Sequence, residues 1–347
     1  VLAQTWAALA FASEVSETGV TVPIVFMGLP LFMVRDEQGR SRVFHNVCSH
    51  RGMQLVCEST PSGLTIRCPY HRWGYDLTGR LKATPNIGGM GVHEVAGFDC
   101  GQHGLKEVRS EEYLGIIFIN LSGEALPLET QFQSITQRWQ ALAGDDFSEI
   151  LVSDPGESGA LELAVNCNYK LAVENYCESY HLPSIHPDLN SYSPLAQHYN
   201  LVVDNVASGQ GTHSYDLGRG DAPPLPVFPH WDNERLKTGE YLSLYPNVLL
   251  GLQADHFFAI ILTSDAPDKT RERLRFFYAG DDALGDATLA RRQSLHAAWS
   301  QVFSEDISVV EGMQRGRASH AFEGGVFSPV MDVPTHHFHQ WFARGYQ

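Results

Sequence analysis

This sequence of 347 residues contains no clusters of Lys and Arg. Lys and Arg number 24 against 40 Asp and Glu, so the formal net charge is −16. Nucleic-acid binding depends on clustered basic side chains, so we expect no such partner, and the charge favours solubility. Apolar runs of membrane-spanning length are missing too, which argues against insertion into a membrane.

Cysteine is sparse, and a secretion signal is not apparent. Six Cys in a chain of this length are too few for a disulfide framework, and in an intracellular protein they more often serve metal or redox chemistry. The sequence starts at Val1 without a charged segment followed by an apolar one, so we expect a trimmed N-terminal end and a cytoplasmic protein. The length predicts two domains with room for two active centres.

Two Cys and two His form a compact four-ligand pattern. Cys48 and His50 are followed by Cys68 and His71, which gives C-x-H-x₁₇-C-x₂-H. Two short pairs on separate loops can close on one metal centre, and zinc and a Rieske-type [2Fe–2S] cluster are both candidates. Zinc sites usually keep Cys with Cys and His with His. One thiolate and one imidazole on each loop therefore favour the mixed cluster.

Short strands are predicted around these two loops. Residues 42–47 and 63–67 read as strands, and residues 73–76 read as a strand followed by a turn at Thr78-Gly79. We therefore expect a small β domain built around the loops. Four further Cys have no assigned role and are expected to be buried free thiols: Cys57, Cys100, Cys167 and Cys177.

The two loops resemble a known signature. Cys48-Ser49-His50-Arg51-Gly52 and Cys68-Pro69-Tyr70-His71-Arg72-Trp73-Gly74-Tyr75 are similar to the cluster-binding segments of Rieske oxygenases. Rieske proteins of the respiratory-chain type carry an additional disulfide between the loops, and its Cys would fall at Met53 and Tyr70. Neither position is Cys, so the oxygenase branch is favoured.

A second group of polar residues follows further along the chain. Residues 173–181 read as a helix that ends just before the next proline, because proline disfavours helical geometry in the residue that precedes it. Glu174, Glu178 and His181 would share one face of this helix, and His186 lies just beyond its end. Two His alone are a weak metal signal, so a third ligand is required.

A carboxylate that interrupts an apolar stripe is the candidate third ligand. Residues 286–317 read as one long helix with this apolar face: Leu295, Trp299, Val302, Phe303, Val310 and Met313. Asp306 falls on the stripe, whereas Glu305 and Glu311 lie off it and are expected to be solvated. A carboxylate that faces a core needs a metal or an ion pair with Arg, and both remain open. Two imidazoles and one carboxylate make the facial triad that holds Fe(II).

These segments also resemble Rieske oxygenases. The stretch from Glu174 to His186 is similar to their iron-binding helix, and Glu305-Asp306 with the later Glu311 is similar to their late carboxylate motif. The resemblance thus spans most of the chain. It implies that Cys48, His50, Cys68 and His71 hold a [2Fe–2S] cluster and that His181, His186 and Asp306 hold one Fe²⁺.

The resemblance also assigns a role to Glu178 and implies partners. Glu178 matches the acidic residue that, in this family, hydrogen-bonds a cluster-ligating His of the neighbouring subunit, where many relatives have Asp. We therefore expect a homotrimer in which electrons cross between subunits. The expected co-reactants are O₂, a small organic substrate and an NAD(P)H-dependent reductase, with or without a ferredoxin.

The expected fold is α+β. The resemblance implies a small all-β Rieske domain with the N-terminal segment over residues 1–122, and a helix-grip (START-like) catalytic domain over residues 123–347 with a curved antiparallel sheet around the iron helices. Residues 256–263 and 271–278 read as a strand pair, and residues 241–252 as another strand. The His336-His337-Phe338-His339 stretch lies in a final helix and is expected to serve packing rather than metal binding.

Substrate identity is the least constrained part of the prediction. Five aromatic residues could stack on an aromatic ring or surround a methylated ammonium, and most of them are expected to belong to the core: Phe228, Trp231, Tyr245, Phe257 and Phe258. Glu178 and the Gln314-Arg315-Gly316 segment resemble the choline, carnitine and betaine monooxygenase branch, which predicts N-demethylation or hydroxylation of a small quaternary amine. Hydroxylation of an aromatic acid is the alternative. An electron carrier or a zinc-stabilised binding module without oxygen chemistry is the alternative of a different class.

Overall fold

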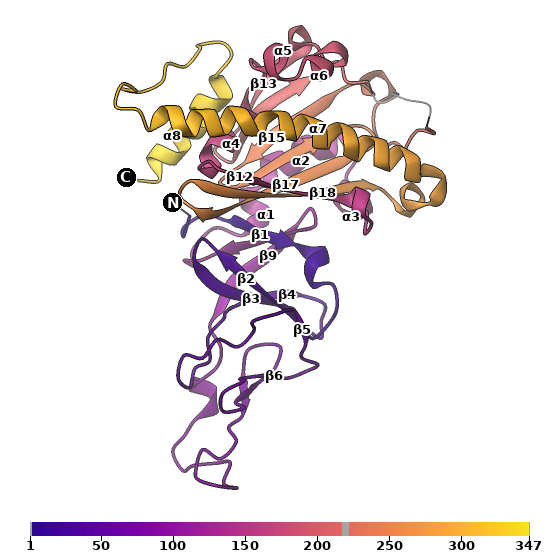
Figure 1. Ribbon diagram of the computed structural model, residues 1–347. Helices are drawn as coiled ribbons and strands as arrows, with labels where there is room; N and C mark the ends of the chain where they lie inside the picture. Colours follow the sequence, from indigo (N-terminus) through magenta and orange to yellow (C-terminus); the bar gives the residue numbers. More distant parts are fainter. Residues whose placement is uncertain (1, 217–221, 347) are drawn as a thin grey trace. The chain divides into compact units, whose positions relative to one another are not determined.

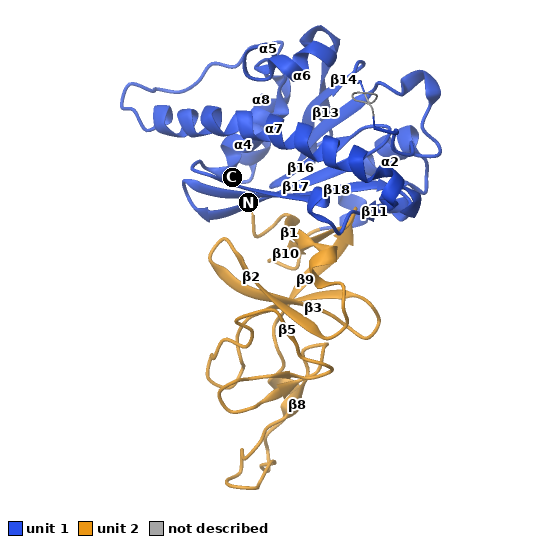
Figure 2. Ribbon diagram, turned by 45° about the vertical axis from the view of Figure 1, so that its right-hand side comes forward, with its two compact units in different colours: residues 1, 126–347 blue, residues 2–125 orange. Residues whose placement is uncertain are grey.

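The computed structural model describes residues 2–216 and 222–346. The chain forms two compact units. In chain order, the first unit is Leu2–Ala125 (orange, unit 2 in the key of Figure 2), and the second unit begins at Leu126 (blue, unit 1 in the key). Each unit has its own sheet and its own buried core. Within the described residues, no helix is both long enough and apolar enough to cross a membrane.

The first unit is built almost entirely of strands. Within its described residues, one antiparallel sheet has seven strands in the order β1-β10-β9-β4-β3-β2-β5, and a second has three in the order β6-β7-β8 (Figure 1). The strands are β1 (Ala7–Phe11), β2 (Val20–Phe26), β3 (Leu29–Arg35), β4 (Ser41–His45), β5 (Thr60–Pro61), β6 (Ile66–Arg67), β7 (Gly74–Tyr75), β8 (Leu81–Ala83), β9 (Glu107–Tyr113) and β10 (Ile116–Asn120).

Both faces of β3 are buried. Leu31 and Met33 pack into one hydrophobic cluster, whereas Phe32 and Val34 pack into another, as the two-residue alternation of a strand requires. The second cluster continues into Cys48, Cys68, Trp73 and Tyr75. The two Cys/His loops are therefore anchored on the hydrophobic core of the unit.

The predicted strands of this unit were correct in place but too long. The strand expected over 63–67 is only Ile66–Arg67, and the one expected over 73–76 is only Gly74–Tyr75. The turn at Thr78-Gly79 is confirmed, because Asp76 accepts hydrogen bonds from the backbone of both Thr78 and Arg80.

The second unit has one large antiparallel sheet. Among residues 126–216 and 222–346, its strand order is β11-β18-β17-β16-β15-β14-β13, and β12 pairs with β18. The strands are β11 (Leu151–Ser153), β12 (Ala160–Val165), β13 (His198–Val203), β14 (Ala207–Thr212), β15 (Gly239–Leu244), β16 (Val248–Leu252), β17 (Phe257–Ala266) and β18 (Lys269–Ala279).

Helix α4 carries Glu174 and helix α7 carries Asp306, and both helices pack beside this sheet. Helix α7 runs across the strands in Figure 1, and α4 contacts β14, β15 and β17 as well as α7 and α8. The helices are α1 (Leu128–Gln131), α2 (Gln133–Ala143), α3 (Phe147–Ile150), α4 (Tyr169–Cys177), α5 (Leu182–Ile185), α6 (Pro187–Tyr192), α7 (Asp286–Arg317) and α8 (Val333–Arg344). The arrangement confirms the expected α+β helix-grip fold.

Three predictions for this unit have mixed outcomes. The helix over 286–317 is confirmed, and the strand pair lies within β17 and β18. The single strand expected over 241–252 is wrong, because Tyr245-Pro246-Asn247 turns the chain and β15 pairs antiparallel with β16. Proline has no N–H for a sheet hydrogen bond, which accounts for the interruption.

The four unassigned Cys do not behave alike. Cys167 and Cys177 are buried free thiols, as predicted, and burial raises the pKa of each to about 12. The prediction is wrong for Cys57, which is exposed, and for Cys100, which is only half-buried. Cys57 follows the buried Val56 into a polar surface loop, where the chain has no second layer to cover it.

Candidate metal centres

The two Cys/His loops have the same backbone construction. Cys48 N–H donates to Met53 O and Gly52 N–H to Cys48 O, while Cys68 N–H donates to Trp73 O and Arg72 N–H to Cys68 O. The turn residue has a positive φ in both loops, 75° at Gly52 and 63° at Arg72. Only glycine adopts this conformation without strain, so Arg72 marks a constrained position.

The loops bring their four candidate ligands to one place. The Cys48 and Cys68 thiols are buried, and burial together with the nearby Cys68 raises the pKa of Cys48. The rings of His50 and His71 meet edge to face with centroids 4.6 Å apart, and Trp73 stacks on His50 at 4.5 Å. A pair of thiols beside a pair of imidazoles fits the donor set of a mixed [2Fe–2S] cluster.

A buried hydroxyl supports the first thiol. The Tyr75 side chain is fully buried, and its hydroxyl lies 3.1 Å from Cys48 Sγ and 3.0 Å from Ser49 Oγ. Burial and the neighbouring Cys48 raise the pKa of Tyr75 well above its ordinary value, so the phenol keeps its proton. The Ser49 backbone N–H also donates to this oxygen. The phenol therefore has a proton to donate to sulfur, as cluster thiolates require.

The helix expected over 173–181 ends earlier than predicted. Helix α4 stops at Cys177, and Glu178 is extended, with φ −123° and ψ 158°. The Glu178 carboxylate accepts hydrogen bonds from the backbone N–H groups of Tyr180 and His181, which competes with continuation of the helix. Glu178 and His181 consequently do not share a helical face, although their side chains still meet.

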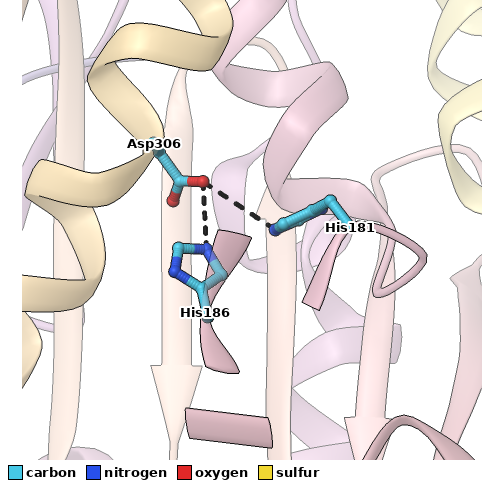
Figure 3. A group of neighbouring side chains, drawn as sticks. All are labelled: His181, His186 and Asp306. Carbon is cyan, nitrogen blue, oxygen red and sulfur yellow. Dashed lines mark hydrogen bonds and ion pairs between the residues drawn. The ribbon is translucent and has the colours of Figure 1, made fainter. Parts of the chain in front are cut away.

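Three side chains converge in the second unit. His181 lies between α4 and α5, His186 follows α5, and Asp306 is on α7 (Figure 3). Asp306 Oδ1 is 3.0 Å from His186 Nε2 and 3.8 Å from His181 Nε2. One donor atom from each of the three residues lies within 4.8 Å of the others. Two imidazole nitrogens and one carboxylate oxygen form the facial donor set typical of non-haem Fe(II).

Both imidazoles are oriented by a second carboxylate. His181 Nδ1 donates to Glu178 Oε1 at 2.6 Å, and His186 Nδ1 donates to Glu305 Oε2 at 2.7 Å. This fixes the proton on Nδ1 and leaves Nε2 of each ring for a metal. Burial opposes a charge on His186, but Asp306 and Glu305 raise its pKa above the ordinary value. The site therefore favours a positive charge, as a cation site must.

The prediction that Glu305 is solvated is wrong. Its neighbour Asp306 follows the helix stripe, but the longer Glu305 side chain reaches around the helix to His186. Glu311 accepts hydrogen bonds from the backbone and side chain of Asn166, so it fixes the approach to α4 rather than facing solvent alone. Sequence reasoning missed Glu305 because helical periodicity alone gave it no partner.

Glu174 lies outside the triad. Its carboxylate, 9% exposed, accepts from both terminal nitrogens of Arg317 and lies 3.0 Å from His339 Nε2. Burial alone would raise the pKa of Glu174, but His339 and Arg317 lower it below the ordinary value. The final helix therefore contributes a packing ion pair, as expected for its His, and Tyr245 similarly bonds His337.

A cavity opens beside the triad. Together with the open space at its mouth it has a volume of about 450 Å³, and aromatic rings form part of its wall. The lining residues are Asn175, Tyr176, His181, Leu182, His186, Leu189, Ser193, His198, Gln210, Tyr241, Trp299, Val302, Phe303 and Asp306. None of the five aromatic residues considered from the sequence lines this cavity, and all five are buried, which agrees with the expectation that most of them belong to the core. Tyr176, Tyr241, Trp299 and Phe303 supply the rings instead.

The opposite wall of the cavity is polar and uncharged. His198 Nδ1 donates to Gln210 Oε1 at 2.7 Å, and Gln210 Nε2 donates to the backbone oxygen of Glu178 at 3.1 Å. Ser193 Oγ lies 3.0 Å from His198 Nε2. Burial lowers the pKa of His198, so its ring is neutral. A hydrogen-bonded path thus connects the cavity wall to the segment that carries Glu178.

Family comparisons cover both units. Residues 153–347 match the family model of the ring hydroxylating alpha subunit (catalytic domain), and residues 5–99 match the Rieske [2Fe-2S] domain. The first match covers more than half of the chain. The two matched segments contain the triad residues and the two Cys/His loops, respectively.

Similar proteins act on quaternary ammonium compounds. The carnitine monooxygenase oxygenase subunit of Escherichia coli K12 is 26% identical over 359 residues, which cover 99% of this chain and 88% of the relative. Choline monooxygenase of Arabidopsis thaliana is 24% identical over 96% of this chain and 75% of the relative. The glycine betaine monooxygenase oxygenase subunit of Chromohalobacter salexigens is 32% identical over 53% of this chain and 38% of the relative.

Solved structures show the same fold. A quaternary ammonium Rieske monooxygenase in complex with L-carnitine superposes with a TM-score of 0.77 at 22% identity, covering 100% of this chain and 90% of the other. Naphthalene 1,2-dioxygenase with indole bound gives a TM-score of 0.71 at 17% identity, covering 99% and 87%. The chain belongs to the ring-hydroxylating alpha subunits: it is a Rieske terminal oxygenase that contains a [2Fe–2S] cluster and a mononuclear iron and depends on a reductase partner.

Proposed function

We propose that Cys48, His50, Cys68 and His71 hold the cluster in the first unit, and that the triad described above holds the iron in the second. The observation that carries the iron assignment is the pairing of both imidazole Nδ1 atoms with carboxylates, which leaves two Nε2 atoms and Asp306 Oδ1 facing one point. When bound, the iron supplies open positions at which O₂ is activated.

Asp306→Ala tests this assignment. The variant should lose the mononuclear iron yet keep the red-brown colour and the rhombic electron paramagnetic resonance signal of the reduced cluster. Glu311→Ala on the same helix is the matched control, since Glu311 bonds Asn166 and touches no proposed ligand. Retention of iron in Asp306→Ala, or a colourless protein that contains zinc, would contradict the assignment.

Glu178 is proposed to connect the two centres across a subunit boundary. Its carboxylate is already bonded to His181, so a single further hydrogen bond from a cluster-ligating His of another subunit would complete an electron path. Because that path requires a second subunit, we propose a homotrimer. The proposed electron source is a cytoplasmic NAD(P)H-dependent reductase, with or without a ferredoxin.

The proposed substrate is a small quaternary amine of the betaine type. Among the described residues that line the cavity none is Lys or Arg, so the negative charge of an aromatic acid would have no cationic partner, whereas a betaine brings its own positive charge beside its carboxylate. The neutral His198 adds none. Trp299, Tyr241 and Phe303 instead offer aromatic rings, which attract a quaternary ammonium group. N-demethylation or hydroxylation next to the ammonium group is the reaction that this wall supports best.

A single-turnover experiment separates this proposal from its alternative. The reduced protein receives O₂ together with either a panel of N-methylated betaines or a panel of aromatic acids, and the products are identified. Formaldehyde from a betaine supports N-demethylation. A hydroxylated ring would show that the substrate is an aromatic acid and would leave the two metal assignments unchanged.

A further inference from the structure

One wall of the cavity is held by a chain of hydrogen bonds. Trp299 lies two helical turns before Asp306 on α7, and its indole Nε1–H donates to His256 Nε2 at 3.0 Å. His256 Nδ1 in turn lies 2.6 Å from Asp255 Oδ1. Because Nε2 accepts, the ring proton of His256 is on Nδ1 and is donated to Asp255. The direction of every hydrogen bond in this chain is therefore fixed.

This chain of hydrogen bonds is deeply buried. His256 is fully buried, and Asp255 and Trp299 are each 4% exposed. Burying a carboxylate with an imidazole is costly, whereas an indole N–H needs only one acceptor. A backbone oxygen suffices for Trp231, which donates to Arg235 O at 3.0 Å. The His–Asp pair therefore does more than satisfy the indole, because it adds a directional restraint to a ring that Phe258 and Phe303 also pack against.

A second cavity lies on the other side of this pair. Together with the open space at its mouth it has a volume of about 770 Å³, and Tyr215, Asp255 and His256 are among its lining residues. Helix α6 contributes to both cavities, with Leu189 facing the triad cavity and Asp188 facing the second one. Helix α7 does the same through Trp299 and Ala298, respectively. Trp299 and its hydrogen-bonded partner thus lie between two adjacent cavities.

We propose that Trp299 sets the largest ammonium group that the triad cavity accepts, and that His256, held by Asp255, is a positioning residue for this ring. The proposal rests on the proposed quaternary amine function. A fixed indole keeps the two cavities apart, so substituents larger than methyl on the ammonium nitrogen would clash with the ring. An indole freed from His256 can turn, and the space of the second cavity then becomes available to a bulkier substituent.

The experiment compares kcat/KM for the trimethyl and triethyl forms of one betaine. The wild type should strongly prefer the trimethyl form. His256→Leu removes the acceptor and Trp299→Phe removes the donor, so each should lower this preference about tenfold or more. His256→Gln keeps an acceptor at the same reach and should retain the preference. His337→Leu is the matched control, because it breaks a comparable bond to Tyr245 away from the cavity.

A double variant distinguishes positioning from a general loss of stability. If the hydrogen bond carries the effect, His256→Leu and Trp299→Phe together should change the preference no more than either alone. Cluster absorbance and iron content report correct folding in every variant. Lower thermal stability with an unchanged preference, or additive effects, would overturn the proposal. A wild type that converts no betaine would instead overturn the proposed function, and the two failures are therefore distinguishable.

Discussion

Removing Glu305 should weaken iron binding without touching any proposed ligand. In Glu305→Ala, His186 loses the carboxylate that accepts its Nδ1–H at 2.7 Å. A hydrogen bond to a charged group contributes about 1.5–3 kcal/mol, and about 1.4 kcal/mol changes a binding constant tenfold. The resulting range of about 10- to 100-fold agrees with the effect of other outer carboxylates on metal affinity. Because the Glu305 side chain is 26% exposed, water screens it and we expect about tenfold.

The assay is competition for Fe(II) with a coloured chelator under anaerobic conditions, with the cluster absorbance as an internal measure of intact protein. Glu305→Gln keeps an oxygen acceptor without the charge and should fall between the wild type and Glu305→Ala. Glu311→Ala should bind iron as the wild type does. The reasoning is refuted if Glu305→Ala keeps wild-type affinity, or if Glu311→Ala loses as much.

Three further predictions concern other residues around the two centres. Glu178→Gln should retain both metals but stop turnover, and normal turnover would rule out the proposed electron path. Tyr75→Phe removes a hydrogen bond to Cys48 Sγ and should lower the reduction potential of the cluster in a redox titration, whereas Tyr70→Phe on the exposed loop should not. Arg317→Met should destabilise the fold by roughly 1.5–3 kcal/mol at neutral pH, since it removes a charged partner of the buried Glu174. The pKa of Glu174 is lower in the folded state than its ordinary value, so the ion pair stabilises the fold at pH values above the ordinary pKa of Glu. Its contribution is lost as the pH falls through the lower pKa of the folded state. The difference in melting temperature between the wild type and Arg317→Met should therefore shrink in acid.

Periodicity and donor chemistry made the three triad residues candidates, and the resemblance to Rieske oxygenases then selected them as iron ligands. Asp306 could be recognised because α7 is one uninterrupted helix, so its position on the apolar stripe translated directly into a position facing the core. His181 and His186 could be recognised because they flank a proline break near two acidic residues. The alternative partner for Asp306 was an Arg, but within the part of the chain that the structure describes its ion-pair partners are the two imidazoles.

Side-chain hydrogen bonds to the backbone account for what periodicity missed. Helix propensity alone predicts a helix that continues to residue 181. In the structure, the Glu178 carboxylate accepts hydrogen bonds from the backbone N–H groups of Tyr180 and His181, and the helix ends before Glu178. The Glu305 side chain is long enough to reach His186, a contact that the position of Glu305 on a helical wheel does not show. Glu178 lies three residues before His181, so a sequence signal existed for it, whereas Glu305 is 119 residues from His186 and had none.

The sequence could not identify the aromatic residues that line the cavity, for a different reason. Strand β17 is buried on both faces, so hydrophobicity could not tell which face meets the cavity. Phe257 packs against Trp139 and Phe277, whereas the next residue, Phe258, packs against Trp299. Phe258 therefore lies one layer behind the cavity wall, and Trp299 lines it. Assigning the face of such a strand requires the position of the helix packed against it.

The charge around the triad links the iron site to the proposed substrate. Asp306, Glu178 and Glu305 place three carboxylates on or next to the two imidazoles. The two positive charges of Fe²⁺ leave one net negative charge, which no Lys or Arg among the described lining residues offsets. A betaine has no net charge and its quaternary ammonium group is attracted to such a cavity, whereas a benzoate carries only a negative charge and is repelled. The carboxylates that orient the iron ligands therefore also select the charge of the substrate.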